Sequence, residues 1–182
     1  MPRARFDDVP LHAADLRLRP VTEDDIDPIF RACQDAETLR WLPLPQPYTE
    51  QVAATFVREI APAQQEAGTG LLRVIDHGGF AGLVDLKATN WRSQVSEIGY
   101  WVAPWARGRG LAGRSAALLA DWGLRTQDLQ RVEIRAATGN LASQKAAVAA
   151  GFTREGVARS AGIVHGGRVD LVIFGRIRAD LT

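Results

Sequence analysis

The feature that most constrains this chain is the segment 107–113, which reads Arg-Gly-Arg-Gly-Leu-Ala-Gly. It follows an apolar stretch that ends at Pro104, and it leads into a helical pattern that starts at Leu111. Glycines let a ligand approach the backbone closely, and the free amide N–H groups at a helix N-terminus bind phosphate. Arg107 and Arg109 add positive charge at the positive end of the helix dipole, which is unfavourable unless an anion is present. The segment therefore predicts a pyrophosphate site.

Two classes of ligand fit such a loop. Gly108-x-Gly110-x-x-Gly113 also spells the dinucleotide fingerprint of NAD-dependent oxidoreductases. That fold requires an acid at the end of the next strand to hold the ribose, whereas here the strand over residues 132–138 is followed by Gly139 and Asn140. Hairpin turns also connect the strands before the loop, so they do not form a parallel sheet. These features disfavour the oxidoreductase, and the missing Lys-Ser/Thr pair disfavours a P-loop NTPase.

The hydrophobic periodicity along the chain predicts one α/β domain over residues 1–182, with 1–14 as a flexible extension. The central strands form an antiparallel meander, because short polar or glycine turns separate them. A mixed, mostly antiparallel sheet flanked by helices is the expected fold. Strands are predicted at residues 16–19, 71–75, 80–88, 95–103, 132–138, 152–158 and 168–177, and helices from 22, 35, 49, 111 and 141.

Composition excludes several function classes. The formal net charge is +1, which does not indicate nucleic-acid binding, and no apolar run has the length of a signal peptide or a membrane span. We therefore expect a cytoplasmic protein, and heavy Arg and Ala usage suggests a bacterial source. Cys33 is the single cysteine and is predicted to be a core residue. The spacing of His, Asp and Glu predicts no metal site.

Several stretches together resemble the GCN5-related N-acetyltransferase (GNAT) superfamily, in particular its RimJ/RimL-type branch. Arg107, Gly110 and Ala112 match the superfamily signature Arg/Gln-x-x-Gly-x-Gly/Ala. Other matching stretches have the same order as in the branch: Leu16-Arg17-Leu18-Arg19-Pro20, Glu97-Ile98-Gly99-Tyr100-Trp101-Val102, Asn140-x-x-Ser143, Gly151-Phe152 and Glu155-Gly156. The resemblance covers essentially the whole chain.

The resemblance implies an acyl-CoA-dependent N-acyltransferase with a sheet that is splayed at the CoA cleft. Residues that would bind the pyrophosphate are Arg107, Gly108, Arg109, Gly110, Leu111, Ala112 and Gly113. The edge of the strand at Trp101 and Val102 would hydrogen-bond the pantetheine arm, and a backbone N–H near Val102 would stabilise the oxyanion. Asn140 and Ser143 would face the far end of the pantetheine and the sulfur.

The implied reaction is attack of an amine on a thioester, within a ternary complex. Because such an amine is mostly protonated at neutral pH, a base helps. Glu97 is the candidate base, with an exposed sheet carboxylate or a water relay as the alternative. Ser143 is the candidate acid, or simply a helix-start residue, since the helix 141–150 lacks the tyrosine of many superfamily members. His165 and Asp170 flank the last turn, for which a hairpin role is favoured over acid–base chemistry.

The sequence does not determine which amine accepts the acyl group. Residues 35–51 and the final hairpin would form its cleft, with Trp41 and Tyr48 as aromatic walls, although Trp41 fits a core role equally well. An N-terminal peptide amine, an aminoglycoside, a polyamine and a small metabolite amine all fit. Acetyl-CoA is the expected donor, with succinyl-CoA or another acyl-CoA as the alternative, and a homodimer is compatible with the resemblance. The rival function is a non-catalytic acyl-CoA sensor.

Overall fold

The strands of the chain pair into one mixed sheet. The structure is a computed structural model that describes residues 4–181, and eight strands lie within those residues. The sheet order is β1-β2-β3-β4-β5-β6-β8-β7, and every neighbouring pair is antiparallel except β5 with β6. The predicted fold class is confirmed. The bounds are β1 Leu11–Ala13, β2 Leu16–Arg19, β3 Leu71–Asp76, β4 Phe80–Asn90, β5 Val95–Val102, β6 Arg131–Ala137, β7 Thr153–Val164 and β8 Gly167–Ile177.

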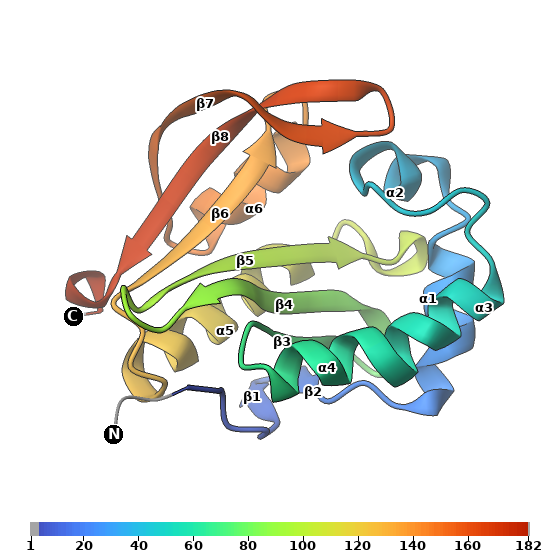
Figure 1. Cartoon of the computed structure of the whole chain (residues 1–182), viewed down its shortest axis with the longest axis horizontal. Helices are drawn as coiled ribbons and strands as arrows, with labels where there is room; N and C mark the ends of the chain where they lie inside the picture. The colour runs from blue at the N-terminus through green and yellow to red at the C-terminus, as the bar shows by residue number, and fades with distance from the viewer. Residues whose placement is uncertain (1–3, 182) are drawn as a thin grey trace.

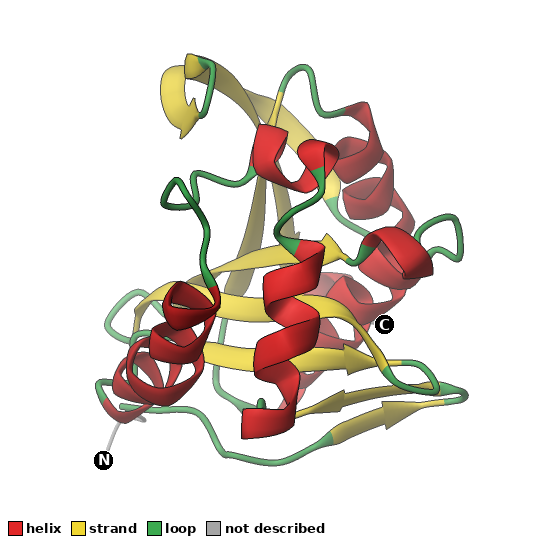
Figure 2. Ribbon diagram, turned by 90° about the vertical axis from the view of Figure 1, so that its right-hand side faces the viewer, coloured by secondary structure: helices red, strands yellow, loops and turns green. Residues whose placement is uncertain are grey.

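Helices cover both faces of the sheet (Figures 1 and 2). On one face, α1 (Ile26–Ala32) and α3 (Glu50–Thr55) pack around a core that includes Val74 and Leu83. The predicted helix from Thr49 continues through a π-helical turn, Phe56–Ile60, into α4 (Ala61–Glu66). On the other face, α5 (Leu111–Thr126) and α6 (Leu141–Ala149) lie over the larger core. The short helix α2 (Ala36–Trp41) stands at one end of the sheet (Figure 1). None of the helices described for residues 4–181 is long and apolar enough to cross a membrane.

The alternation of apolar residues along β4 and β5 explains this two-sided core. Leu86 and Ile98 are at most 1% exposed on the α5 side, whereas Leu83 points into the opposite core. Successive side chains of a strand point to opposite faces, so a strand between two helical layers is apolar on both.

The ends of β5 and β6 separate. These two strands pair in parallel over only three positions, Val95 with Arg131, Ser96 with Val132 and Glu97 with Glu133. Beyond Glu133, β6 follows β8, whereas β5 stays with β4 as far as Val102. The strands β6, β8 and β7 consequently fan away from β5 (Figure 1). The splay expected from the resemblance is present.

One predicted strand was too short. The sequence pattern indicated a strand that ends at residue 158, but β7 continues to Val164 and forms a long hairpin with β8. The register of the two strands shifts between Ala158 and Gly162, and Ser160 takes a positive φ of 53°. Such a bulge breaks the alternation of side chains, and this break is why the pattern appeared to stop.

The N-terminal segment packs against the domain. We expected residues 1–14 to be flexible; residues 1–3 lie outside the described residues, but Phe6 is only 4% exposed. Its ring lies 4.7 Å from that of Trp91 and 6.1 Å from that of Trp122, and β1 adds a strand beside β2. Residues 4–14 thus contact the domain, although the single aromatic residue of this segment gives no periodic signal in the sequence.

Removal of the Phe6 ring should therefore destabilise the whole fold. We expect Phe6→Ala to lower the free energy of unfolding by about 3–5 kcal/mol, the usual cost for a buried aromatic. The matched control is Val9→Ala, since Val9 is 41% exposed in the same segment. Urea denaturation of both variants is the measurement. Equal and small losses would mean that the segment contributes little to stability.

Candidate active site

The separation of β5 and β6 opens a cleft of about 920 Å³. Its walls come from both separated strands, the loop before α5, the first turns of α5 and α6, helix α2 and the β7–β8 hairpin. Several of the predicted site residues line it, namely Glu97, Trp101, Val102, Arg107, Gly108, Gly110, Leu111, Ala112, Gly113, Asn140 and Ser143. From Ile98 to Val102, the side of β5 that faces β6 has no strand partner in the described part of the chain. An extended ligand can add to this free edge.

The glycine loop lies at the mouth of the cleft. Gly108 has a φ of 78°, and Gly110, the N-cap residue of α5, has a φ of 69°. A Cβ on either residue would meet no atom within 4 Å, so their conformation and not crowding by the protein requires glycine. A Cβ on Gly113 would lie 3.1 Å from the Ala146 oxygen, so this glycine lets α6 pack closely on α5. The loop thus leaves the amides at the start of α5 open to the cleft.

The Arg107 side chain turns away from the loop. Its Nη2 lies 2.6 Å from Asp35 Oδ2 and 2.8 Å from Thr38 Oγ1. Asp35 also caps α2 by accepting a bond of 2.9 Å from the Thr38 amide. The guanidinium of Arg107, assisted by the cap, lowers the pKa of Asp35. One of the two loop cations is thus neutralised within the protein, whereas Arg109 is exposed and has no ion pair among residues 4–181.

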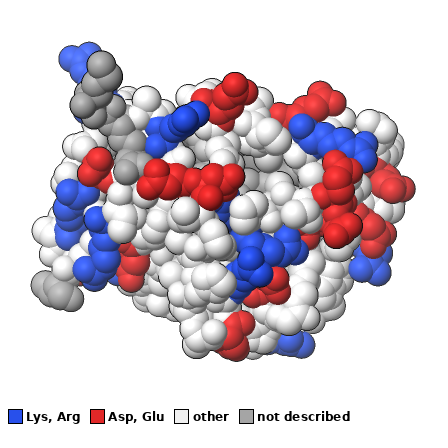
Figure 3. Space-filling view, turned by 90° about the horizontal axis from the view of Figure 1, so that it is seen from below, with Lys and Arg blue, Asp and Glu red and all other residues white. Residues whose placement is uncertain are grey.

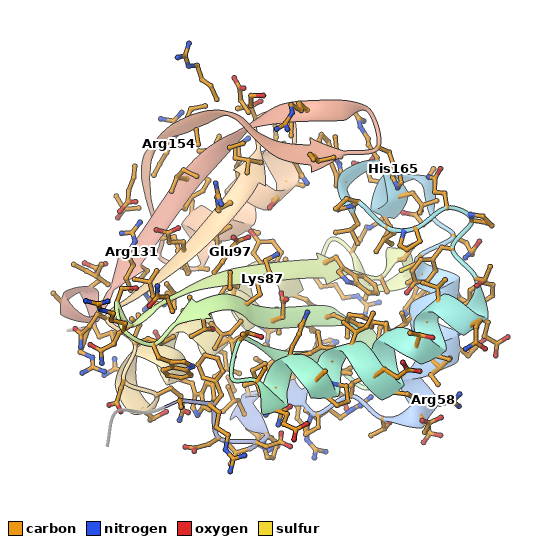
Figure 4. All side chains as sticks on the ribbon, viewed as in Figure 1. Arg58, Lys87, Glu97, Arg131, Arg154 and His165 are labelled. Carbon is orange, nitrogen blue, oxygen red and sulfur yellow. The ribbon has the colours of Figure 1, made fainter. Side chains whose placement is uncertain are left out.

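Glu97 belongs to a group of charges on the floor of the cleft. Its Oε1 lies 3.4 Å from Nζ of Lys87, and Figure 4 shows the two side by side on β5 and β4. A Cβ on Gly99 would lie 2.5 Å from Asp85 Oδ1 and 2.7 Å from Lys87 Nζ, so these side chains lie over Gly99. Burial raises the pKa of Asp85, against the effect of Lys87. Asp85 and Lys87 were not predicted as site residues, although they alternate along the neighbouring hairpin strand β4.

Asn140 and Ser143 begin α6. Asn140 Oδ1 accepts a bond of 3.0 Å from the Ser143 amide, which makes Asn140 the helix cap. The Tyr100 hydroxyl of β5 donates to the Ser143 carbonyl oxygen at 2.7 Å, and Ser143 Oγ donates to Tyr100 Oη at 3.2 Å. Burial raises the pKa of Tyr100 to about 12. Helix α6 has no tyrosine, and the one that β5 supplies was not predicted as a site residue.

The far end of the cleft is built by α2 and the β7–β8 hairpin. Trp41 lines it and lies against Gly139, where a Cβ would come within 3.3 Å of the ring. Tyr48 is 9% exposed and belongs to the core beside α1 and α3, so its predicted wall role is wrong. His165 at the hairpin tip contacts Gln46 at 3.3 Å (Figure 4), and Asp170 accepts from the Ser160 amide. His165 therefore links the tip of the β7–β8 hairpin to the segment that carries Gln46. Asp170 joins the two strands of the hairpin at the bulge near Ser160.

Surface charges elsewhere form small mixed groups. Figure 3 shows acidic and basic side chains next to each other on the face that carries β1 and β2. One such group joins Arg19 to Asp25 and Asp76, at 2.7 and 3.1 Å. Within residues 4–181, no three His, Cys, Asp or Glu side chains are grouped as a metal site would require.

Comparison with known proteins gives a family. The model of the acetyltransferase (GNAT) domain matches residues 15–153. A Bacillus subtilis protein, "putative ribosomal N-acetyltransferase YdaF", is 31% identical over 134 residues, which are 73% of this chain and 70% of that protein.

Two solved structures share the fold. One is RimL, a ribosomal L7/L12 α-N-protein acetyltransferase in complex with coenzyme A; it has a TM-score of 0.84 and 23% identity, and the match covers 93% of this chain and 98% of RimL. The other is Mycobacterium smegmatis RimJ in complex with a CoA disulfide, also with a TM-score of 0.84 and 23% identity, over 95% of this chain and 88% of RimJ. At this identity the likeness establishes the fold.

The Arg107–Asp35 pair makes a prediction about pH. The pKa of Asp35 is depressed, so its contribution to stability is present above the ordinary value near 3.9 and is lost as the pH falls through the lowered value. Arg107→Ala should move the Asp35 pKa back up, as measured by carboxyl NMR titration. Arg31→Ala, which removes an exposed pair on α1, is the control. An unchanged Asp35 titration in Arg107→Ala would contradict the pairing.

Proposed function

This chain belongs to the acetyltransferase (GNAT) family, and we propose that it transfers an acetyl group from acetyl-CoA to the N-terminal α-amine of a protein. The observation that carries this proposal is the free edge of β5, from Ile98 to Val102, with the amides of α5 at its end. Family membership disfavours the oxidoreductase alternative, because the same glycine loop serves a CoA pyrophosphate in this family.

The cleft suits the chemistry of the donor. The pantetheine arm carries amides that can pair with the free edge of β5 as an added strand does. The pyrophosphate fits the open amides at the N-terminus of α5, where the helix dipole favours negative charge. Lys145 lines the cleft, whereas Arg109, in the glycine loop, is exposed and lies outside the cleft lining. Neither has an ion pair among the described residues, so both are available for phosphate. With the pyrophosphate there, the thioester lies deeper, where β5 and β6 converge.

We assign the role of the base to Glu97. It lies at the last paired position of β5 and β6, at the closed end of the cleft. The amine nitrogen attacks the thioester carbonyl carbon, a C–N bond forms, and the nitrogen loses a proton to Glu97 directly or through a water. A backbone N–H on the free edge of β5 stabilises the oxyanion that forms. The C–S bond then breaks, and the sulfur takes the electron pair.

The open end of the cleft favours a chain end as the acceptor. Helix α2 and the hairpin leave an entrance lined by Trp41, Pro43 and Ile163, which an extended peptide can enter amine first. The RimJ/RimL-type resemblance and the name of the Bacillus relative support a protein N-terminus. Such an acceptor and acetyl-CoA both occur in the cytoplasm, where we place the protein. The alternative acceptor is a small-molecule amine.

The acceptor class is tested with purified protein and acetyl-CoA. Release of CoA thiol is followed with peptides that have free or blocked N-termini, and with polyamines and aminoglycosides. We expect turnover with free peptide N-termini and an added acetyl mass on the α-amine. Turnover confined to small amines would refute the acceptor, and donor binding without turnover on any amine would favour the sensor alternative.

A charge in the glycine loop should prevent donor binding. Gly110→Asp places a carboxylate where the pyrophosphate is proposed to bind, so we expect the affinity for acetyl-CoA to fall at least 30-fold in calorimetry. Gly78→Asp is a matched control, because Gly78 has a similar φ of 72° and equally free surroundings in a turn outside the cleft. Unchanged affinity in Gly110→Asp, or equal losses in both, would exclude this pyrophosphate site.

Removal of the Glu97 charge should slow chemistry and spare binding. Glu97→Gln is expected to lower kcat about 100-fold, the low end for a lost general base, with acetyl-CoA affinity within twofold. Glu133→Gln is the control, since Glu133 pairs with Glu97 across the ladder but is held by Arg131 at 2.8 Å. If the pH profile of kcat/KM is the same in Glu97→Gln as in the wild type, Glu97 is structural.

A further inference from the structure

The chain has two tyrosines, and one of them reaches the cleft from an unexpected side. Tyr100 lies on β5, at the cleft wall, with its hydroxyl joined to both polar groups of Ser143: the carbonyl oxygen at 2.7 Å and Oγ at 3.2 Å. These bonds link β5 to the first turn of α6 across the cleft. The phenol is therefore held at the place where the sequence analysis expected only the Ser143 hydroxyl.

Tyr100 and Glu97 point to opposite sides of the same strand. Glu97 shares its face with Gly99 and Trp101, whereas Tyr100 shares the face of Ile98 and Val102, toward α6. A thioester that lies along the free edge of β5 therefore has the carboxylate on one side and the phenol on the other. This arrangement suits the two proton transfers of the reaction. The amine must lose a proton, which the carboxylate can take, and the sulfur must gain one, which the phenol can give.

The acidity of the two hydroxyls decides which one can supply that proton. An ordinary phenol has a pKa of about 10, close to the value of about 8.5 for a thiol. An aliphatic hydroxyl has a much higher pKa, closer to that of water, and is a much weaker acid than a phenol. Burial raises the pKa of Tyr100 to about 12, so the phenol keeps its proton at neutral pH and still remains a stronger acid than serine. Proton transfer to sulfur is therefore easier from Tyr100 than from Ser143.

The geometry also gives Ser143 a role. Its Oγ donates to Tyr100 Oη, and a hydrogen bond of this kind lowers the phenol pKa because it favours the phenolate. The bond strengthens as negative charge develops on Oη. The Tyr100 proton, meanwhile, points to a carbonyl oxygen and can turn to another acceptor at the cost of one neutral hydrogen bond.

We propose that Tyr100 is the catalytic acid that protonates the departing CoA thiolate, and that Ser143 is a positioning residue that holds the phenol and stabilises the phenolate. The inference rests on the proposed acetyl transfer. As the C–S bond breaks, the sulfur keeps the electron pair and takes the Oη proton, which yields CoA thiol and Tyr100 phenolate. Water then protonates the phenolate, and Glu97 releases to water the proton that it took from the amine. Both side chains thereby return to their starting states.

The test compares Tyr100→Phe with Ser143→Ala and the double variant. Tyr100→Phe keeps the ring and should lower kcat about 100-fold, with the KM for acetyl-CoA within twofold. Ser143→Ala should lower kcat less, about threefold to tenfold, and should add nothing in the Tyr100→Phe background. Tyr48→Phe is the control, because the buried Tyr48 lies outside the cleft, and its kcat should stay within twofold.

A second measurement separates acidity from packing. In the Tyr48→Phe background Tyr100 is the only tyrosine, so a monofluorinated tyrosine supplied during expression enters at that position alone. The more acidic phenol should raise kcat at neutral pH, whereas a structural role would leave kcat unchanged. Wild-type kcat in Tyr100→Phe, a larger loss in Ser143→Ala than in Tyr100→Phe, or an unchanged kcat in the fluorinated protein would overturn the proposal. Failure of the wild-type protein to acetylate any amine would instead defeat the proposed function.

Discussion

The three-position parallel pairing between β5 and β6 is the constraint on which the rest of the structure depends. It joins the two halves of the sheet, because β1 to β5 lie on one side of it and β6 to β8 on the other. If the pairing continued to Val102, the free edge and the cleft would be absent. Since it ends at Glu97 and Glu133, the chain keeps one continuous sheet and still exposes backbone amides to a ligand. The site is thus a consequence of the point at which two strands stop pairing.

Much of this fold could be predicted from local patterns. Helix α5 follows the predicted range of residues 111–126, because a glycine-rich start and a long apolar stripe are strong signals. The meander from Leu71 to Val102 is similarly clear, since turns of glycine and polar residues bound its strands. The bulge near Ser160 and the short β1 were missed. Both belong to local hairpins, but β1 is only three residues long and the bulge interrupts the alternation of side chains along β7.

The site could be predicted only in part. The loop glycines and Asn140 are recognisable because their conformations are set by local backbone geometry, a positive φ in one case and a helix cap in the other. The partner of Arg107 on α2 and the phenol beside Ser143 are separated from their contacts by 72 and 43 positions. Nothing in the spacing of those residues reports such contacts, which arise when the elements pack.

The bond between Arg107 and the cap of α2 has a consequence for kinetics. It connects the loop proposed to hold the donor with the helix that walls the acceptor end of the cleft. A shift of the loop on donor binding would be transmitted through this pair to α2, and the affinities for the two substrates would then be coupled. Thermodynamic reciprocity then requires each substrate to change the affinity of the other by the same factor. Loss of this ion pair would therefore weaken the effect of each substrate on the other equally.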